Sequence, residues 1–264
     1  DKWWAVGGAR MAVVTDGMLN EAQQHALELE FKSAGDGVRN EGFWGINVVE
    51  GRTYKLSFWM KGQPSYRGRL TAELQTEDGK PLGSKDMTVN VGREWTKMTA
   101  EITATGTDTR GWFALKGSAA GTVVLDVVSL FPPTYKGREN GCREDLAKML
   151  EAANPSFVRF PGGCYVEGHF ADGKTNRFEW KNTIGPIEER PGHMNRNWGY
   201  NVSDGFGFHE MLQLTEDLGA EPLFVVNMGM GHGWGVDYNR IEEYIQEALD
   251  ALEYCNGDAA TTKW

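Results

Sequence analysis

The sequence has few cysteines, no cluster of basic residues and no long apolar run. Its three cysteines lie far apart and match no zinc-ligand spacing, which argues against a disulfide framework or a zinc module. Cys142 and Cys255 lie in or beside expected helices and are expected to pack there. The net charge of −10 without a Lys/Arg cluster argues against nucleic-acid binding. No run of about 18 apolar residues exists, so no membrane span is expected.

The opening residues lack a secretory signal peptide. The start DKWWAVGG has neither a basic n-region nor an apolar h-region. It fits a cytoplasmic protein or a mature or excised piece of a longer chain, and we favour a secreted or periplasmic protein over a cytoplasmic one. The sequence also has no internal repeat and no low-complexity tract.

The first half of the chain, residues 1–132, has the pattern of an all-β domain. Apolar and polar residues alternate over residues 27–31 and 56–60, as in half-buried strands. Further short runs follow, separated by turn signals such as Asp78-Gly79. This spacing predicts a jelly-roll β-sandwich. Pro132-Pro133 ends the pattern and is the predicted domain boundary.

The second half, residues 133–264, changes to a helical period. Helices are expected over residues 146–150, 208–215 and 241–252, and apolar strands over residues 157–160 and 222–226. The middle helix is expected to begin at a cap formed by Ser203-Asp204 and to end at Gly219. This order of elements predicts parallel βαβ units. Two strands cannot close a (β/α)8 barrel, so an incomplete TIM-type barrel is predicted.

The segment from Phe157 to Trp198 is the most informative part of the chain. Its apolar start, FVRF, stops at Pro161-Gly162-Gly163, where Gly frees the backbone and Pro fixes it. A long stretch rich in Arg, Glu, Asn and Trp follows, and loops of such length inside a domain are usually functional. A buried strand, a Gly-rich exit and a polar loop are typical of the catalytic face of a (β/α) barrel.

Three motifs in this region carry a family resemblance. RFPGGCYVEG, WKNTIGPIEERPG and NWGYNVSDGFG, in this order, resemble the family 51 α-L-arabinofuranosidases of the glycoside hydrolases. The resemblance implies the central portion of a retaining enzyme that removes terminal L-arabinofuranosyl residues from arabinoxylan or arabinan, in the degradation of hemicellulose. A related activity on β-xylosides or β-glucans stays open, because fold and motifs do not fix the substrate.

The catalytic residues of the family have no counterpart here. Glycosidases of this kind act through two carboxylates that flank the scissile bond. In the family both are glutamates, one after an asparagine at the end of the fourth barrel strand and one at the end of the seventh. Asn-Glu occurs at Asn20-Glu21 and Asn40-Glu41, but both pairs lie in the β half. The catalytic pair is therefore expected beyond Trp264, and the chain alone is expected to be inactive.

The resemblance places four side chains in the sugar pocket. Arg159 has a guanidinium fork that holds a sugar hydroxyl or a carboxylate, and a structural ion pair is the alternative. Cys164 lies close to the furanose after the PGG turn, or is a buried inert thiol. Trp198 is expected to form a wall of the pocket by stacking, or to pack. Asn227 ends the next barrel strand, a position that faces the site.

Other polar residues of the second half are weaker candidates. His232 and Trp234 follow Asn227 in a Gly-rich loop and are possible rim residues. Without a family in mind, the adjacent pair Glu188–Glu189 is the obvious pair of carboxylates. We expect this pair to order its loop with Arg190 or Arg196, because adjacent side chains point in different directions.

The β half resembles the carbohydrate-binding-module-like sandwich of one branch of the same family. The likeness is carried by NEGFWG at residues 40–45 and VLDVVSL at residues 124–130. It implies glycan binding, with Trp44 and Trp112 as candidates, although aromatic residues of strands more often fill a core. Asp126 matches a strand residue that can ligate a structural calcium, with a hydrogen-bonded strand Asp as the alternative. No cofactor is expected for catalysis.

Two other functions stay open at this point. The first is a non-catalytic glycan-binding protein that acts through the sandwich, and it is motivated by the missing glutamates. The second is a different reaction that uses Glu188 or Glu189. The expected partner is a plant cell-wall polysaccharide or an arabino-oligosaccharide. Because an open half-barrel exposes apolar strand edges, a second polypeptide that completes the barrel, or a homo-oligomer, is a further possible partner.

Overall fold

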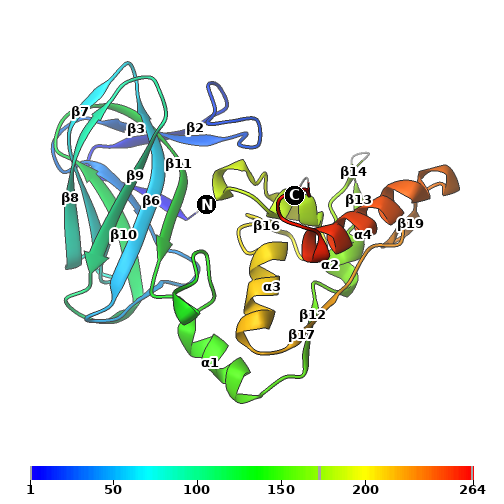
Figure 1. The fold of residues 1–264 in the computed structure, drawn as a ribbon. Helices are drawn as coiled ribbons and strands as arrows, with labels where there is room; N and C mark the ends of the chain where they lie inside the picture. Colours follow the sequence, from blue (N-terminus) through cyan, green and yellow to red (C-terminus); the bar gives the residue numbers. More distant parts are fainter. Residues whose placement is uncertain (1, 172–173, 263) are drawn as a thin grey trace. The chain divides into compact units, whose positions relative to one another are not determined.

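The computed structural model describes residues 2–171, 174–262 and 264 (Figure 1). The chain divides into two compact units, the first ending at Gly137 and the second beginning at Arg138. No helix among the described residues is long and apolar enough to cross a membrane.

The first unit is a sandwich of two antiparallel sheets (Figure 1). One sheet has the order β1-β4-β10-β7-β8, with β5 also paired to β10, and the other has the order β2-β3-β11-β6-β9. The predicted β-sandwich is confirmed. The first sheet contains β1 (Trp3–Val6), β4 (Gly37–Asn40), β5 (Ile46–Val48), β7 (Tyr66–Gln75), β8 (Pro81–Val91) and β10 (Asp108–Gly117). The second contains β2 (Arg10–Val14), β3 (Ala26–Phe31), β6 (Thr53–Gly62), β9 (Thr96–Thr103) and β11 (Gly121–Phe131).

Alternating apolar residues build the core between the two sheets. In β6, Leu56, Phe58 and Met60 are buried, while the residues between them are more exposed. Leu29 and Phe31 of β3 join the same core. Because burial of such a side chain contributes about 1.5–3 kcal/mol, the alternation that predicted the strands also stabilises the sandwich.

Among its described residues, the second unit contains a short parallel sheet and four α-helices. Strands β12 (Phe157–Phe160) and β17 (Glu221–Phe224) pair in parallel, and α3 (Phe208–Asp217) lies between them in sequence. In the part of the chain that the structure describes, this is the whole of the parallel sheet, so an incomplete barrel is confirmed. The other helices are α1 (Glu144–Ala152), α2 (Gly163–Glu167) and α4 (Ile241–Asn256). The 3₁₀ helices of the chain are η1 (Tyr135–Gly137), η2 (Trp180–Thr183), η3 (Ile187–Glu189) and η4 (Tyr238–Arg240).

The described part of the second unit also contains three small antiparallel strand pairs. They are β13 (Phe170–Ala171) with β14 (Lys174–Thr175), β15 (His193–Asn195) with β16 (Tyr200–Val202), and β18 (Met230–Gly231) with β19 (Trp234–Gly235). The sequence pattern did not predict them, because strands of two or three residues are too short to show a period. The strand expected over residues 222–226 is also shorter than predicted, since β17 ends at Phe224.

The predicted start of α3 is wrong. The helix is capped by Gly207 rather than by Ser203-Asp204, and the backbone N–H of Gly207 donates to Glu210 Oε2 at 2.9 Å. A Cβ at residue 207 would collide with the backbone carbonyl of Thr183, so the close approach of this loop requires glycine. The predicted end is confirmed, because Gly219 has φ 67 and follows directly after the cap residue Leu218.

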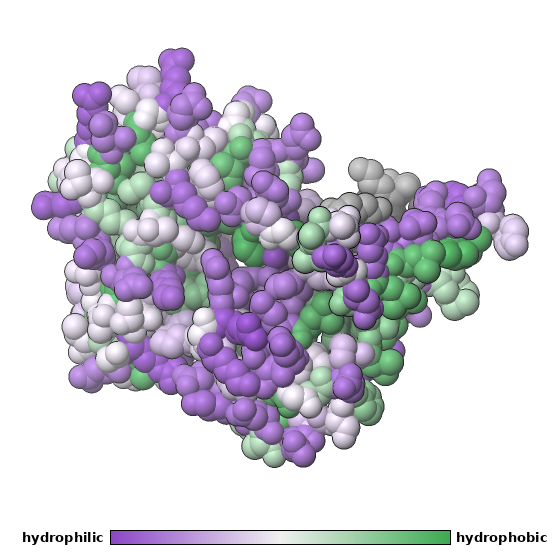
Figure 2. Space-filling view, in the orientation of Figure 1, coloured by the Kyte–Doolittle hydropathy of each residue, from purple (hydrophilic) through white to green (hydrophobic). Residues whose placement is uncertain are grey.

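Several apolar helix and strand residues of the second unit are exposed. Figure 2 shows hydrophobic residues gathered over the end of this unit that carries α4. In a closed (β/α)8 barrel, neighbouring strands and helices cover apolar residues of this kind. An incomplete barrel lacks some of these neighbours, so the residues stay exposed. Cys255 in α4 is also exposed, so the expectation that it packs is wrong, whereas Cys142 before α1 is half-buried. The exposed apolar residues of α1, β17 and α4 are Leu146, Met149, Leu150, Leu223, Ile245, Leu249 and Leu252.

Candidate functional site

The Pro161-Gly162-Gly163 turn leads directly from β12 into α2. Gly162 has φ 93, and a Cβ at this position would collide with the guanidinium of Arg159. The glycine therefore lets the Arg159 side chain lie across the turn at the carboxyl end of the strand. Arg159 is exposed at the end of this strand. Its role in binding a sugar remains a prediction.

Cys164 and Trp198 belong to neighbouring segments that Asn197 holds together. Cys164 is half-buried in α2, and its backbone carbonyl accepts a hydrogen bond of 2.6 Å from Asn197 Nδ2. Trp198 is next in the turn between β15 and β16, where its backbone N–H donates to Asn195 Oδ1 at 3.3 Å. Trp198 is 56% exposed, so part of this large aromatic residue is accessible to a ligand.

Asn227 is buried and binds backbone groups on two sides. Its Nδ2 donates to the carbonyl of Val166 in α2 at 2.8 Å. Its Oδ1 accepts from the N–H groups of Gly229 and Met230 at 2.7 and 3.0 Å. These bonds attach the β18–β19 hairpin to α2, so Asn227 positions the hairpin. The sequence, in which Asn227 simply follows an apolar strand, did not predict this role.

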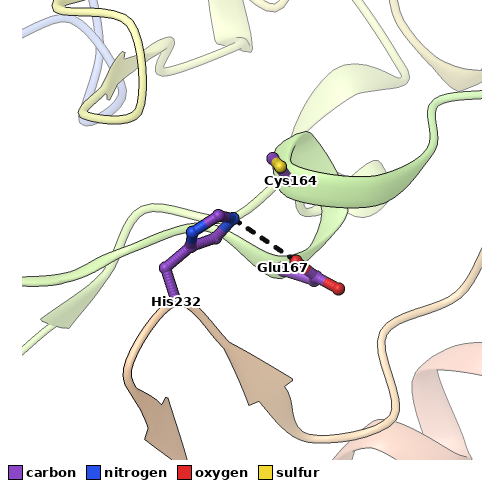
Figure 3. A group of neighbouring side chains, drawn as sticks. All are labelled: Cys164, Glu167 and His232. Atoms are coloured by element: carbon purple, nitrogen blue, oxygen red, sulfur yellow. Dashed lines mark ion pairs between the residues drawn. The ribbon is translucent and has the colours of Figure 1, made fainter.

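The same hairpin places His232 beside α2. The backbone N–H of His232 donates to the carbonyl of Gly168 at 3.2 Å, and its ring stacks on His169 with 6.4 Å between centroids. Figure 3 shows the side chains of Cys164, Glu167 and His232 near one another, with the ion pair between His232 and Glu167 marked. One possible metal-ligand atom from each lies within 4.8 Å of the other two, and His232 Nε2 is 3.5 Å from Glu167 Oε2.

Sequence reasoning missed Glu167. The signal was present, because Cys164 and Glu167 are three residues apart and such residues share one face of a helix. His232, which was only a weak candidate, is brought to that face by the hairpin. Glu188 and Glu189 lie in η3 instead, and Glu189 is exposed.

A buried ion pair orders the motifs around the site. The guanidinium of Arg190 donates to both carboxylate oxygens of Glu210 at 2.9 and 3.1 Å, and the two side chains are 5% and 7% exposed. Arg190 also donates to the carbonyls of Gly185, Asp204 and Gly205. Burial opposes the charge of Glu210, but hydrogen bonds from Arg190 and Gly207 hold its pKa below the ordinary value. Arg190 thus joins the GPIEERPG and SDGFG segments.

A second polar cluster contains Tyr165 of α2 together with His193 and Asp204. His193 Nδ1 is 2.9 Å from Asp204 Oδ1, and Asp204 is buried. The ring of Tyr165 packs on the ring of His193 with 5.8 Å between centroids. Burial, followed by the nearby Asp204 and Tyr200, raises the pKa of Tyr165, so this phenol stays protonated at neutral pH. Asp204, predicted as a helix cap, instead belongs to this cluster.

In the sandwich, the two candidate tryptophans differ in exposure. Trp44 is 82% exposed in the loop between β4 and β5, and it packs on Phe43, which is 74% exposed, with 4.6 Å between ring centroids. Trp112 in β10 is half-buried, and the guanidinium of Arg39 lies 4.1 Å from the centre of its ring. Trp44 therefore offers an open apolar face, whereas one face of Trp112 is already occupied by a cation.

Asp126 has one free carboxylate oxygen. Its Oδ1 accepts the N–H of Val127 at 2.8 Å, whereas its buried Oδ2 has no hydrogen-bond partner within the described residues. Burial raises the pKa of this carboxyl. One free oxygen fits a calcium ligand, but calcium takes about six to eight oxygens. Trp59, the cross-strand neighbour of Asp126, contributes an N–H group that has no partner among the described residues, rather than an oxygen. Calcium at Asp126 stays a prediction.

Known proteins match both units. A carbohydrate binding domain model matches residues 1–121, and an alpha-L-arabinofuranosidase 1 domain model matches residues 149–264. The two matches describe a carbohydrate-binding-module-like sandwich followed by part of an α-L-arabinofuranosidase domain, an arrangement typical of glycoside hydrolases. Over most of its length the chain is homologous to α-L-arabinofuranosidases, among them a family 51 enzyme of known structure, and it corresponds to a part of their length.

Individual relatives support this assignment. Alpha-L-arabinofuranosidase 1 of Arabidopsis thaliana is 38% identical over 87% of this chain and 34% of its own length. The extracellular exo-alpha-L-arabinofuranosidase of Streptomyces chartreusis is 39% identical over 99% of this chain and 32% of its own. The solved structure of arabinose-bound MgGH51 α-L-arabinofuranosidase superposes with a TM-score of 0.93, at 35% identity, over 99% of this chain and 43% of that one. The chain thus spans about a third to two fifths of the length of the curated relatives it matches.

Proposed function

We propose that this chain is part of a retaining exo-α-L-arabinofuranosidase, which removes terminal L-arabinofuranosyl residues from arabinoxylan or arabinan. The observation that carries the proposal is the fit of the whole chain to an arabinose-bound relative, with the PGG turn at the carboxyl end of β12. In barrels of this kind the loops after the strands form the site.

In this proposal the second unit forms one side of the sugar pocket. Arg159 supplies hydrogen-bond donors, and the open indole of Trp198 stacks on the apolar face of the furanose. In sequence, Cys164 lies between these two residues, on the first turn of α2. Its backbone carbonyl accepts a hydrogen bond from the side chain of Asn197. Asn227 positions the pocket by holding the β18–β19 hairpin against α2.

The catalytic glutamates are proposed to lie on sequence outside the 264 residues. A retaining glycosidase needs two carboxylates about 5–5.5 Å apart. The family resemblance assigns neither carboxylate to this chain, which covers about a third of its curated relatives. The chain by itself is therefore expected to bind sugar without hydrolysing it.

Release of nitrophenol from an aryl α-L-arabinofuranoside tests this division. The 264-residue chain, with its intact mass verified, is compared with a longer polypeptide that continues past Trp264. Turnover by the longer form alone, with retained anomeric configuration by NMR, is the expected result. Turnover by the 264-residue chain would place a complete catalytic pair within it, and an inverted product would contradict the retaining mechanism.

A second candidate function is glycan binding by the sandwich. The exposed pair of Phe43 and Trp44 favours it, because their rings lie 4.6 Å apart and exposed aromatic rings offer apolar surface to sugar rings. Affinity electrophoresis in soluble arabinoxylan measures the binding. We expect arabinoxylan to retard the unchanged chain and Trp44→Ala to abolish this retardation. Trp4→Ala, at another exposed tryptophan of this unit, should leave the retardation intact. Unretarded migration of the unchanged chain would contradict it.

The remaining parts of the proposal concern location and partners. A secreted protein is proposed, because the polysaccharide substrate is outside cells and the Streptomyces relative is named extracellular. The exposed apolar residues of α1, β17 and α4 support a partner surface for the rest of a barrel, on the same or a second polypeptide. We also propose that Asp126 binds a structural calcium ion. Added Ca²⁺ should then raise the Tm of the chain, and Asp126→Asn should remove this rise.

A further inference from the structure

We propose that Cys164, Glu167 and His232 form a binding site for Zn²⁺. The inference goes beyond the proposed glycosidase activity, because hydrolysis by two carboxylates needs no metal. It concerns the face of α2 shown in Figure 3, where a thiol, a carboxylate and an imidazole converge.

The distances between the three donors suit zinc. All three atoms lie within 4.8 Å of one another, and the imidazole Nε2 and carboxylate Oε2 are 3.5 Å apart. Bonds of about 2.0–2.3 Å in a tetrahedral zinc site place ligand atoms about 3.3–3.8 Å from one another. Small side-chain rotations of Cys164 and Glu167 are therefore enough to bring all three donors to one ion.

Two independent features of the backbone fix this geometry. Cys164 and Glu167 are three residues apart on α2, so the helix itself places them on one face. His232 comes from the β18–β19 hairpin, whose backbone is bonded to the end of α2 through the carbonyl of Gly168. The site is thus built from two segments that hydrogen bonds already join.

Side chains around the donors restrict their motion further. The ring of His169 lies parallel to the ring of His232, with an interplanar angle of 14° and 6.4 Å between the centroids. Asn227 links the hairpin to Val166, which lies between Cys164 and Glu167 on α2. Such residues behind the ligands are needed to orient a metal site.

The chemistry of the donors selects the metal. Thiolate and imidazole ligands favour zinc over calcium or magnesium, which prefer oxygen. A Cys thiolate and a Glu carboxylate neutralise the charge of a divalent ion, and the thiol proton is released when the metal binds. The side chains of Glu167 and His232 are 47% and 43% exposed, so a fourth position is open to water, as in three-ligand zinc sites.

Binding of Co²⁺ and Zn²⁺ to the 264-residue chain, under reducing conditions, tests the proposal. One equivalent of Co²⁺ is expected to give a sulfur-to-cobalt charge-transfer band, which Zn²⁺ displaces. Cys164→Ser should abolish the band, and Glu167→Gln and His232→Asn should each weaken Zn²⁺ binding at least tenfold. Cys142→Ser, Cys255→Ser and His209→Ala are matched controls, because these residues lie outside the cluster and should leave the band unchanged.

The proposal is overturned if the chain takes up no equivalent of Zn²⁺, or if the band survives Cys164→Ser or is lost in Cys142→Ser or Cys255→Ser. Near-ultraviolet circular dichroism of each metal-free variant shows whether it has folded. Should Cys164→Ser fail to fold, Glu167→Gln and His232→Asn decide, and full binding by both would overturn the site. No substrate is present, so the outcome is independent of the glycosidase activity.

Discussion

The side-chain amide of Asn227 donates a hydrogen bond of 2.8 Å to the backbone carbonyl of Val166, and so joins the segment after β17 to α2. The same side chain accepts two backbone N–H groups at the start of the β18–β19 hairpin. One buried amide therefore sets the distance between His232 on the hairpin and Cys164 on the helix. Asn227 is a positioning residue for whatever this face binds.

Replacing Asn227 should loosen the hairpin. Asn227→Ala removes all three bonds and leaves buried backbone groups unsatisfied, at a cost of about 1–3 kcal/mol for each such group. Hydrogen–deuterium exchange of peptides covering α2 and residues 228–236 should become faster, while exchange in the sandwich stays unchanged. Zn²⁺ binding should weaken in parallel. Unchanged exchange of the hairpin would show that Asn227 does not hold it.

Glu210 should make the second unit sensitive to acid. Its pKa is held below the ordinary value of 4.5, so its charged form is favoured by folding. A carboxyl of lowered pKa contributes stability above its unfolded pKa and loses that contribution as the pH falls through the folded pKa. Exchange in α3 should therefore accelerate as the pH is lowered below about 4.5, after correction for intrinsic exchange rates.

Glu210→Gln should remove most of this acid dependence and destabilise α3 at neutral pH. It leaves the buried Arg190 charge without its partner, which costs about 3–5 kcal/mol. Glu243→Gln is the matched control, because its ion pair with Arg240 is exposed and such pairs contribute at most about 1 kcal/mol. Equal effects of the two substitutions would contradict the assigned role of the buried pair.

The two candidate tryptophans of the sandwich should respond differently to substitution. Trp44 has φ 67, a left-handed conformation that costs a non-glycine residue about 1–2 kcal/mol. Because its side chain is exposed, Trp44→Gly should leave the stability of the sandwich unchanged or slightly raised. Trp112→Ala should lower it by about 1–3 kcal/mol, through lost packing and the lost Arg39 contact. Exchange of amides in β7 measures both, and a larger loss with Trp44→Gly would contradict the prediction.

Local patterns predicted the fold well where the chain is regular. The alternation of Leu56, Phe58 and Met60 identified β6, and the apolar run before Pro161 identified β12, because burial on one or both faces of a sheet leaves a period in the sequence. The start of α3 was predicted wrongly because Gly207 is required by its approach to Thr183, a contact between distant residues.

The candidate site was only partly predictable for the same reason. The motif after β12 indicated where a site lies, and Cys164 and Glu167 share a helix face that the spacing alone specifies. His232 joins them only because Asn227 and the carbonyl of Gly168 hold the β18–β19 hairpin, whose strands have two residues each, in place. No local period marks such a hairpin, so its partner residues could not be named from the sequence.

If the glycosidase and zinc proposals both hold, Zn²⁺ should inhibit the complete enzyme competitively. Cys164 belongs both to the predicted sugar pocket and to the metal cluster, so an ion bound to its sulfur occupies the space of the furanose. KM for an aryl α-L-arabinofuranoside should rise with Zn²⁺ while kcat stays constant, and a chelator should restore the original KM. His232→Asn should make KM insensitive to Zn²⁺, while Cys255→Ser should behave like the unchanged enzyme. A fall in kcat at constant KM would mean that zinc acts away from the sugar pocket.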